Sequence, residues 1–154
     1  MSDSGSSSDV QINKILLPID GSDTSFKAAR YAIKMASQNG ASIFCIYVIE
    51  IPTYGLYGSV GATAPTYYNE VVKSADEWFE EVKEVAQKSG VKIKTESLMN
   101  ASSVPDSIVN YAAKNNIDII VMGTRGRTGV KKLFLGSVAS AVVSHAHCPV
   151  LVVR

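Results

Sequence analysis

Five short apolar runs, separated by segments with a helical period, make up the pattern of this chain. Residues 14–19 and 41–49 are apolar almost throughout and do not alternate with polar residues. Strands that are buried on both faces of a parallel sheet have this continuous pattern. Residues 117–122 and 150–153 are similar, whereas residues 91–98 alternate at first and predict a half-exposed strand near a sheet edge.

The segments between these runs repeat their apolar residues with the period of an α-helix. The first spans residues 23–39, where the turn DGSD offers a serine or aspartate cap and Gly40 can end the helix. Shorter helices are predicted at residues 105–115 and 137–144. Strand and helix signals therefore alternate along the chain.

The longest helical segment covers residues 66–89 and ends before Gly90. It follows residues 50–64, a long stretch rich in Gly, Pro and Tyr that can be a lid, a partner surface or a mobile insertion. Trp78 borders the apolar stripe of the helix, which favours a place in the core or against a partner helix over contact with a ligand. The stripe that we expect to be buried consists of Val72, Ala75, Phe79, Val82 and Ala86.

Strands that alternate with helices in this way predict an α/β fold with a doubly wound, five-stranded parallel sheet of Rossmann-like type and helices on both faces. A chain of 154 residues, 46% hydrophobic and 19% charged, is long enough for one such domain and leaves little room for a second. We assign residues 12–154 to this domain. Residues 1–11, rich in Ser, Asp and Gly, are expected to be a disordered tail.

The charge balance limits the classes of partner. The 15 Lys and Arg residues against 14 Asp and Glu residues give a formal net charge of +1, which does not favour binding to nucleic acid or to an anionic membrane. The longest apolar run, residues 43–49, is too short to cross a bilayer. The first ten residues lack the basic start and apolar centre of a signal peptide. We therefore expect a soluble cytoplasmic protein without nucleic-acid or membrane partners.

The two cysteines imply no disulfide framework. Cys45 lies within a strand pattern, where a thiol acts as a small hydrophobic group. Cys148 forms the motif H-x-H-C with His145 and His147, and these side chains could be metal ligands. Further ligands at zinc-like spacing are missing, so a turn leading into the last strand explains the motif better.

The stretch that carries the chemistry is the loop MGTRGRTGVKKLFLGS, residues 122–137, between the fourth strand and the last helix. Glycine allows a sharp turn and a close approach of the backbone to a ligand, and the free N–H groups of a helix N-terminus attract anions. Gly123, Gly126 and the pair Gly136-Ser137 therefore predict a phosphate cradle. The alternative is a flexible loop followed by a helix that Ser137 caps.

Two arginines, Arg125 and Arg127, add positive charge to this loop and can pair with phosphate. The usual nucleotide signatures are absent, because the chain contains neither G-x-x-x-x-G-K-[ST] nor a G-x-G-x-x-G in this loop. If this loop binds phosphate, it does so through a pattern other than these two signatures.

Read as Gly123, two residues, Gly126, nine residues and Gly136-Ser137, the loop resembles the ATP-binding signature of the universal stress protein family. That family implies the strand order 3-2-1-4-5. In a sheet of this order, ligands bind at the carboxyl ends of the strands, beside the point between strands one and four where the winding reverses. The resemblance runs from residue 12 to residue 154. It includes PID at 18–20, YVIE at 47–50, DIIVMGTRG at 118–126 and HCPVLVV at 147–153.

The resemblance implies an adenine nucleotide at this point. Asp20 would accept hydrogen bonds from a ribose hydroxyl or from the adenine amino group, although a residue of an Asx turn is the alternative. Val48 matches the family position that holds adenine. The expected nucleotide contacts are Pro18, Asp20, Val48, Met122, Gly123, Arg125, Gly126, Arg127, Gly136, Ser137 and Val138.

No catalytic constellation accompanies these residues in the sequence, and Asp20 is the only acid placed to reach the ligand. We therefore expect a stress-response regulatory protein that binds ATP, or AMP or ADP, with little hydrolysis and with an unknown protein partner. Mg²⁺ would be held through the phosphates of the nucleotide. The alternatives are a slow adenine-nucleotide hydrolase and an interaction module without nucleotide.

The last strand predicts a homodimer. In the order 3-2-1-4-5 it lies at a sheet edge, and PVLVVR is almost wholly apolar and lacks the inward charge or bulge that discourages pairing. The same strand of a second copy, antiparallel about a two-fold axis, can cover this edge. The family resemblance implies the same assembly.

Overall fold

The computed structural model describes residues 9–50, 64–100, 103–126 and 134–154. The predictions for the first eight residues, for most of the 50–64 loop and for Arg127 lie outside these ranges. The elements, in chain order, are β1 (Lys14–Pro18), α1 (Asp23–Asn39), β2 (Ser42–Glu50), α2 (Ala64–Lys88), β3 (Lys92–Asn100), α3 (Val104–Lys114), β4 (Ile119–Gly123), α4 (Ser137–His145) and β5 (Val150–Val153).

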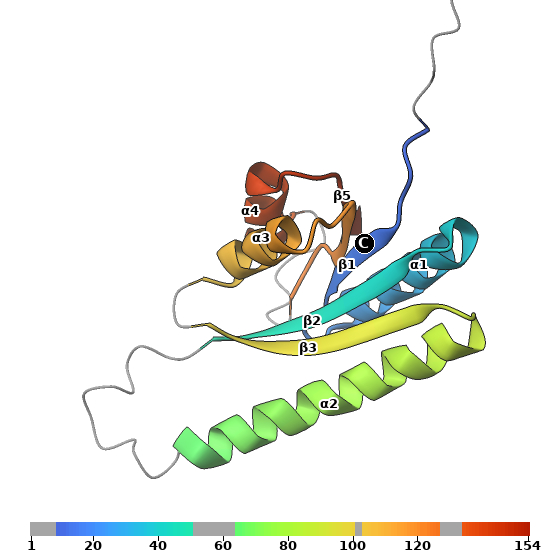
Figure 1. Ribbon diagram of the computed structural model, residues 1–154. Coiled ribbons are helices and arrows are strands. Elements are labelled where there is room, and N and C mark those ends of the chain that lie inside the picture. Colours follow the sequence, from blue (N-terminus) through green and yellow to red (C-terminus); the bar gives the residue numbers. More distant parts are fainter. Residues whose placement is uncertain (1–8, 51–63, 101–102, 127–133) are drawn as a thin grey trace, which may run out of the picture.

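The five strands form one sheet in the order β3-β2-β1-β4-β5, and every neighbouring pair is parallel. This confirms the predicted α/β class and strand order. The chain winds outward from β1 to β3 and then crosses to β4 on the other side of β1 (Figure 1). The carboxyl ends of β1 and β4 therefore meet where the direction of winding changes.

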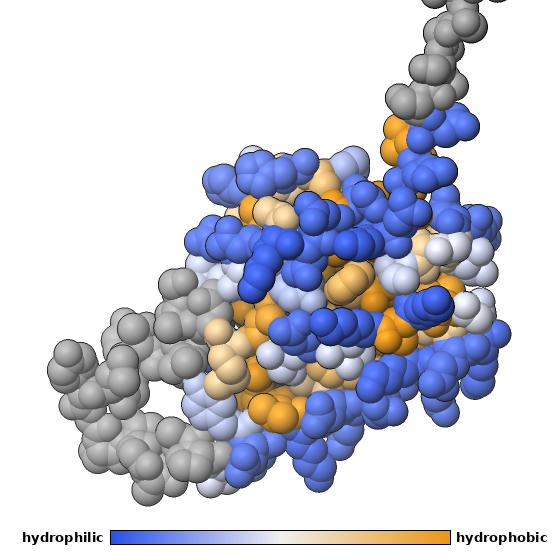
Figure 2. All heavy atoms as spheres, viewed as in Figure 1, coloured by the Kyte–Doolittle hydropathy of each residue, from blue (hydrophilic) through white to orange (hydrophobic). Residues whose placement is uncertain are grey.

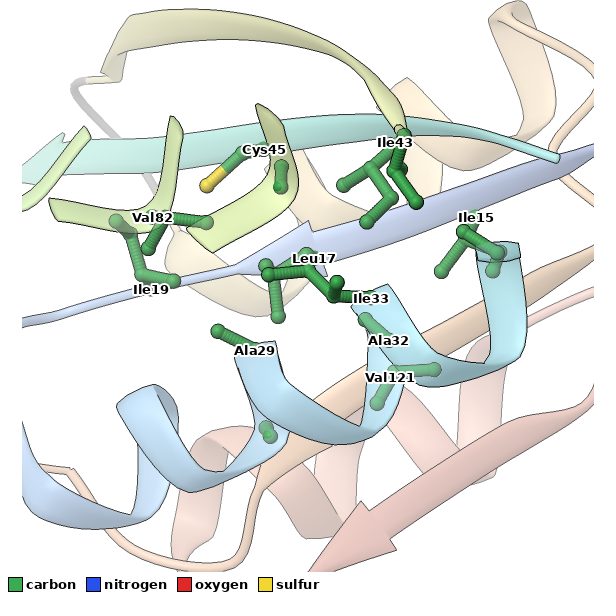
Figure 3. Packing of buried hydrophobic residues seen from close by; sticks show 14 of the residues in the cluster. Ile15, Leu17, Ile19, Ala29, Ala32, Ile33, Ile43, Cys45, Val82 and Val121 are labelled. Atoms are coloured by element: carbon green, nitrogen blue, oxygen red, sulfur yellow. The ribbon is translucent and has the colours of Figure 1, made fainter. Parts of the chain in front are cut away.

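Helices α1 and α2 cover one face of the sheet, and α3 and α4 cover the other (Figure 1). The continuous apolar run of β1 follows from this layering, because both faces of the strand are buried. Ile15 and Leu17 point to the α1 side and pack with α1, β2, α2 and β4 (Figure 3), whereas Leu16 points to the α3 side. All three side chains are fully buried.

The helix boundaries follow local chemistry that the sequence showed. The Ser22 side chain accepts a hydrogen bond from the Ser25 N–H and caps α1, and Gly40 ends the helix at φ +66°, in the left-handed region. Ser103 caps α3 through the N–H of Asp106. The Ser22 cap was one of the two alternatives predicted for the turn DGSD.

The predicted stripe of α2 is confirmed at Ala75, Phe79, Val82 and Ala86, which are all buried. It is wrong at Val72, which is 37% exposed. The first turns of α2 reach the carboxyl edge of the sheet, where a cleft takes the place of the core.

The outer face of α2 is hydrophilic, and hydrophobic side chains show mainly along the edge strand β3 (Figure 2). Within the described residues, no helix has the length and apolarity needed to cross a bilayer.

A cleft at the carboxyl edge of the sheet

A cleft of about 510 Å³ opens at the carboxyl ends of β1, β2 and β4 and reaches the start of α4. Every predicted contact residue that the structure describes lines it; only Arg127 falls outside the described ranges. These residues are Pro18, Asp20, Val48, Met122, Gly123, Arg125, Gly126, Gly136, Ser137 and Val138. Segments more than 100 residues apart in the sequence thus share one concave surface.

Asp20 follows β1 and uses its two carboxylate oxygens differently. Oδ1 accepts hydrogen bonds from the N–H of Ser22, at 3.0 Å, and from its hydroxyl, at 2.5 Å. This is the Asx turn named as the alternative. Oδ2 faces the glycine loop, because a Cβ on Gly126 would lie 3.0 Å from it. One oxygen can therefore hold the turn while the other faces the cleft.

The turn before α1 also fixes the loop after β4. The hydroxyl of Thr24 donates to the carbonyl oxygen of Arg125 at 2.7 Å, and that of Ser22 lies 3.3 Å from the same oxygen. Since Arg125 follows the end of β4, these bonds hold the first residues of the glycine loop against the end of β1. The two halves of the cleft are thereby joined.

The glycines of the loop meet different neighbours. A Cβ on Gly123 would lie 2.7 Å from Thr24 Oγ1 and 2.8 Å from the carbonyl carbon of Thr24, so this glycine lets α1 pack against the end of β4. A Cβ on Gly136 would lie 2.8 Å from the carbonyl oxygen of Thr124, to which Gly136 donates its own N–H at 2.7 Å. Of these three glycines, Gly126 is the one whose added Cβ would meet a side chain and no backbone atom, namely the carboxylate of Asp20.

Helix α4 begins at the cleft, where its first backbone N–H groups lie. Its N-cap is Gly136, and no side chain caps it. Ser137 is the first residue of the helix, so the alternative of a Ser137 cap is wrong. The first N–H groups of a helix have no partner within the helix, and its dipole is positive at that end. This end of the cleft suits an anionic group such as phosphate.

Another part of the cleft wall is apolar and includes backbone groups near the end of β2. The side chains of Val48 and Met122 are buried, and with Pro18 they form part of its wall. The last pair between β1 and β2 is Pro18 with Ile46, whose carbonyl accepts the N–H of Ile19. Backbone direction alternates along a strand, so the N–H and C=O of Val48 point to the same side as those of Ile46, beyond the end of β1.

Several lining residues were not predicted. Tyr67 and Val71 come from the first turns of α2, and only the packing of α2 across the sheet edge brings them here. Thr124 is buried and lies within the glycine motif, at a position where the motif fixes no residue type. The other additional lining residues are Ile19, Ser25, Tyr47, Ile49, Glu50, Val104, Ile108 and Ala139.

Neither Cys45 nor any residue of the H-x-H-C motif lines the cleft. No three His, Cys, Asp or Glu side chains in the part of the chain that the structure describes lie together as a metal site would require. The ring of His145 lies 2.8 Å from the carbonyl oxygen of Ala141 on its own helix. Burial raises the pKa of the Cys148 thiol and that of the Cys45 thiol, which disfavours the thiolate that a metal or a nucleophilic reaction needs.

Comparisons with known proteins agree with this geometry. The profile of the Universal stress protein family matches residues 11–154. A universal stress protein of Methanocaldococcus jannaschii is 41% identical over 145 residues, which cover 92% of this chain and 81% of the relative. Universal stress protein UspA from Lactobacillus plantarum has a similar structure, with a TM-score of 0.85, 26% identity and coverage of 94% of this chain and 99% of that one.

A third, more distant structure is that of the universal stress protein from Archaeoglobus fulgidus in complex with dAMP. It has a TM-score of 0.66 and 22% identity, and the match covers 94% of this chain and 99% of that one. At this identity the likeness concerns the fold. Together with the profile match over nearly the whole chain, these relatives show that the chain belongs to the universal stress protein family.

Proposed function

We propose that this protein binds an adenine nucleotide, with ATP as the principal ligand and ADP or AMP as alternatives, and that binding rather than turnover is its function in the stress response. Residues 12–154 would form the nucleotide-binding domain. The observation that carries the proposal is the start of α4, where a helix N-terminus without a side-chain cap opens into the cleft. A structural neighbour in complex with dAMP supports an adenine nucleotide as the ligand.

The residues present fit such a ligand. The N–H groups that follow Gly136 would hold phosphate, with the Arg125 guanidinium as a charge partner. The backbone of Val48 and the apolar side chains of Val48 and Met122 would hold the base. Asp20 would accept a hydrogen bond from a ribose hydroxyl or from the adenine amino group. Mg²⁺ would be held by the phosphates and water, because such an ion needs few protein ligands.

The experiment is mass spectrometry of the small molecules released by denaturing freshly purified protein, followed by calorimetric titration of the stripped protein with ATP, GTP and inorganic phosphate. We expect an adenine nucleotide in the extract and tighter binding of ATP than of GTP. Binding of phosphate alone, or equal affinity for both nucleotides, would contradict adenine recognition at Val48 and Asp20.

We further propose that two copies associate through β5, which lies beside β4 at the edge of the sheet formed by the described residues. Val150, Leu151 and Val152 are partly exposed on this edge strand. An apolar edge strand with unpaired backbone groups favours pairing with a second strand. An unidentified protein partner that responds to the nucleotide state would complete the regulatory function.

A further inference from the structure

The single tryptophan of the chain, Trp78, meets the turn that carries Asp20. Trp78 lies on α2 and packs, partly buried, against the core under α1 and α2. A Cβ on Gly21 would lie 2.3 Å from Cζ2 and 2.4 Å from Cε2 of the indole. No side chain fits into that space, so the indole ring rests directly on the Gly21 backbone.

Gly21 satisfies two requirements at once. Its φ of +79° lies in the left-handed region that L side chains rarely adopt, and the indole occupies the place of any Cβ. The neighbours of Gly21 are Asp20, whose Oδ1 accepts two hydrogen bonds from Ser22, and Ser22 itself, which caps α1. Contact with Gly21 therefore restrains both residues that close the turn.

Tyr47, which lines the cleft, also contacts the indole. The rings of Tyr47 and Trp78 meet edge to face, with centroids 5.2 Å apart and an interplanar angle of 89°. Tyr47 lines the cleft, as do Tyr67 and Val71 from the first turns of α2. Helix α2 thus meets the cleft directly through its first turns and indirectly through Trp78.

We propose that Trp78 is a positioning residue of the nucleotide site: by resting on Gly21 it holds the Asp20 turn so that Oδ2 of Asp20 faces the cleft. The inference rests on the proposed function, and it gives α2 control over nucleotide affinity. Coupling is reciprocal. Nucleotide binding must therefore stabilise the contact between Trp78 and Gly21, and anything that displaces α2 must weaken nucleotide binding.

The first test is a double-mutant cycle between Trp78→Leu and Asp20→Asn, read as ATP affinity by calorimetry. We expect Trp78→Leu to weaken ATP binding about tenfold, within the usual range of coupling between sites. In the Asp20→Asn background the same change should have little further effect, because the two residues act as a unit. The matched control is Phe79→Leu, which truncates the next residue of α2, buried in the same core, and should lower stability without changing affinity.

The second test needs no nucleotide. Protons of Gly21 close to the indole face resonate upfield in NMR spectra, and we expect this shift in the wild type and in Phe79→Leu but not in Trp78→Leu. An unshifted Gly21 in the wild type would overturn the inference. So would an unchanged ATP affinity in Trp78→Leu, or effects of Trp78→Leu and Asp20→Asn that simply add. A wild type that binds no adenine nucleotide would instead overturn the proposed function, and the positioning role with it.

Discussion

At the scale of single residues, the glycines of the loop after β4 share one signature but differ in their physical role. The missing Cβ of Gly123 makes room for the backbone of α1, and that of Gly136 makes room for the carbonyl group of Thr124. Gly126 is exposed and faces the carboxylate of Asp20. Two of the three signature glycines, Gly123 and Gly136, are thus required by packing even without a ligand.

Alanine substitutions separate these roles. Gly123→Ala places a methyl group against the backbone of Thr24 and Ser25, which cannot move independently of α1, so we expect a loss of about 1–3 kcal/mol in the free energy of unfolding. Gly126→Ala meets only the Asp20 carboxylate and should change stability by less than about 0.5 kcal/mol. Urea denaturation of both variants checks this. Equal losses would contradict the distinction.

The sequence showed which residues of the loop were special but not why. Spacing and the family resemblance together predicted that Gly123, Gly126 and Gly136 share one site, and all three line one cleft. The sequence could not show that Gly123 is held against Thr24, since that contact joins segments about 100 residues apart. Tyr67 was missed for the same reason: an aromatic residue near a helix start gives no sign of the cleft that it lines.

At the scale of elements, prediction succeeded where the pattern was local. The caps of α1 and the continuous apolar run of β1 follow from a few neighbouring residues. Val72 was wrongly placed in the core, because a helical period shows which residues share a face but not where the surface beneath the helix ends. The length of α2 relative to the sheet depends on tertiary packing.

One hydrogen bond between elements makes stability depend on pH. The hydroxyl of Tyr111 on α3 donates to Glu96 on β3 at 3.0 Å. Burial, with the bond to Glu96 and its negative charge, raises the pKa of Tyr111 from 10.0 to about 12. The raised pKa means that the folded state favours the neutral phenol. The stabilisation of the folded state by the neutral Tyr111 phenol is therefore complete below pH 10. It is lost as the pH rises from about 10 through about 12.

The corresponding variant is Tyr111→Phe. We expect it to lower the free energy of unfolding by at most about 1 kcal/mol at pH 8, because water reaches the exposed Glu96 carboxylate. The difference between wild type and variant should shrink as the pH rises above 10. Guanidinium titrations at pH 8 and pH 11 measure it, and a difference that grows with pH would have the wrong sign for this account.

At the scale of the whole molecule, the proposed pairing of β5 with a second copy predicts the oligomeric state. Val152→Lys introduces a charge on a partly buried position of the edge strand, so we expect a monomer or an aggregate in place of the wild-type dimer. Met99→Lys on the opposite edge strand β3, where Met99 is 57% exposed, is the control and should remain dimeric. Sedimentation at micromolar concentration decides; a monomeric wild type would rule out the proposed association.

The whole site also predicts very slow turnover. Among the described residues that line the cleft, the acidic ones are Asp20 and Glu50, and one oxygen of Asp20 is already engaged by Ser22. We therefore expect neither of these acidic residues to act as the base that activates water. Phosphate release should be far below about one per second, the low end of ordinary enzymes. A rate near that value, abolished in Gly126→Ala, would assign the protein to the hydrolases.

The central claim, a nucleotide held between the end of β1 and the start of α4, is tested most directly by titrating ATP into wild-type and Gly126→Ala protein in a calorimeter. We expect saturable binding to the wild type and at least about tenfold weaker binding, roughly 1.4 kcal/mol, to the equally stable variant. Equal affinities for the two proteins, or no heat of binding in the stripped wild type, would contradict it.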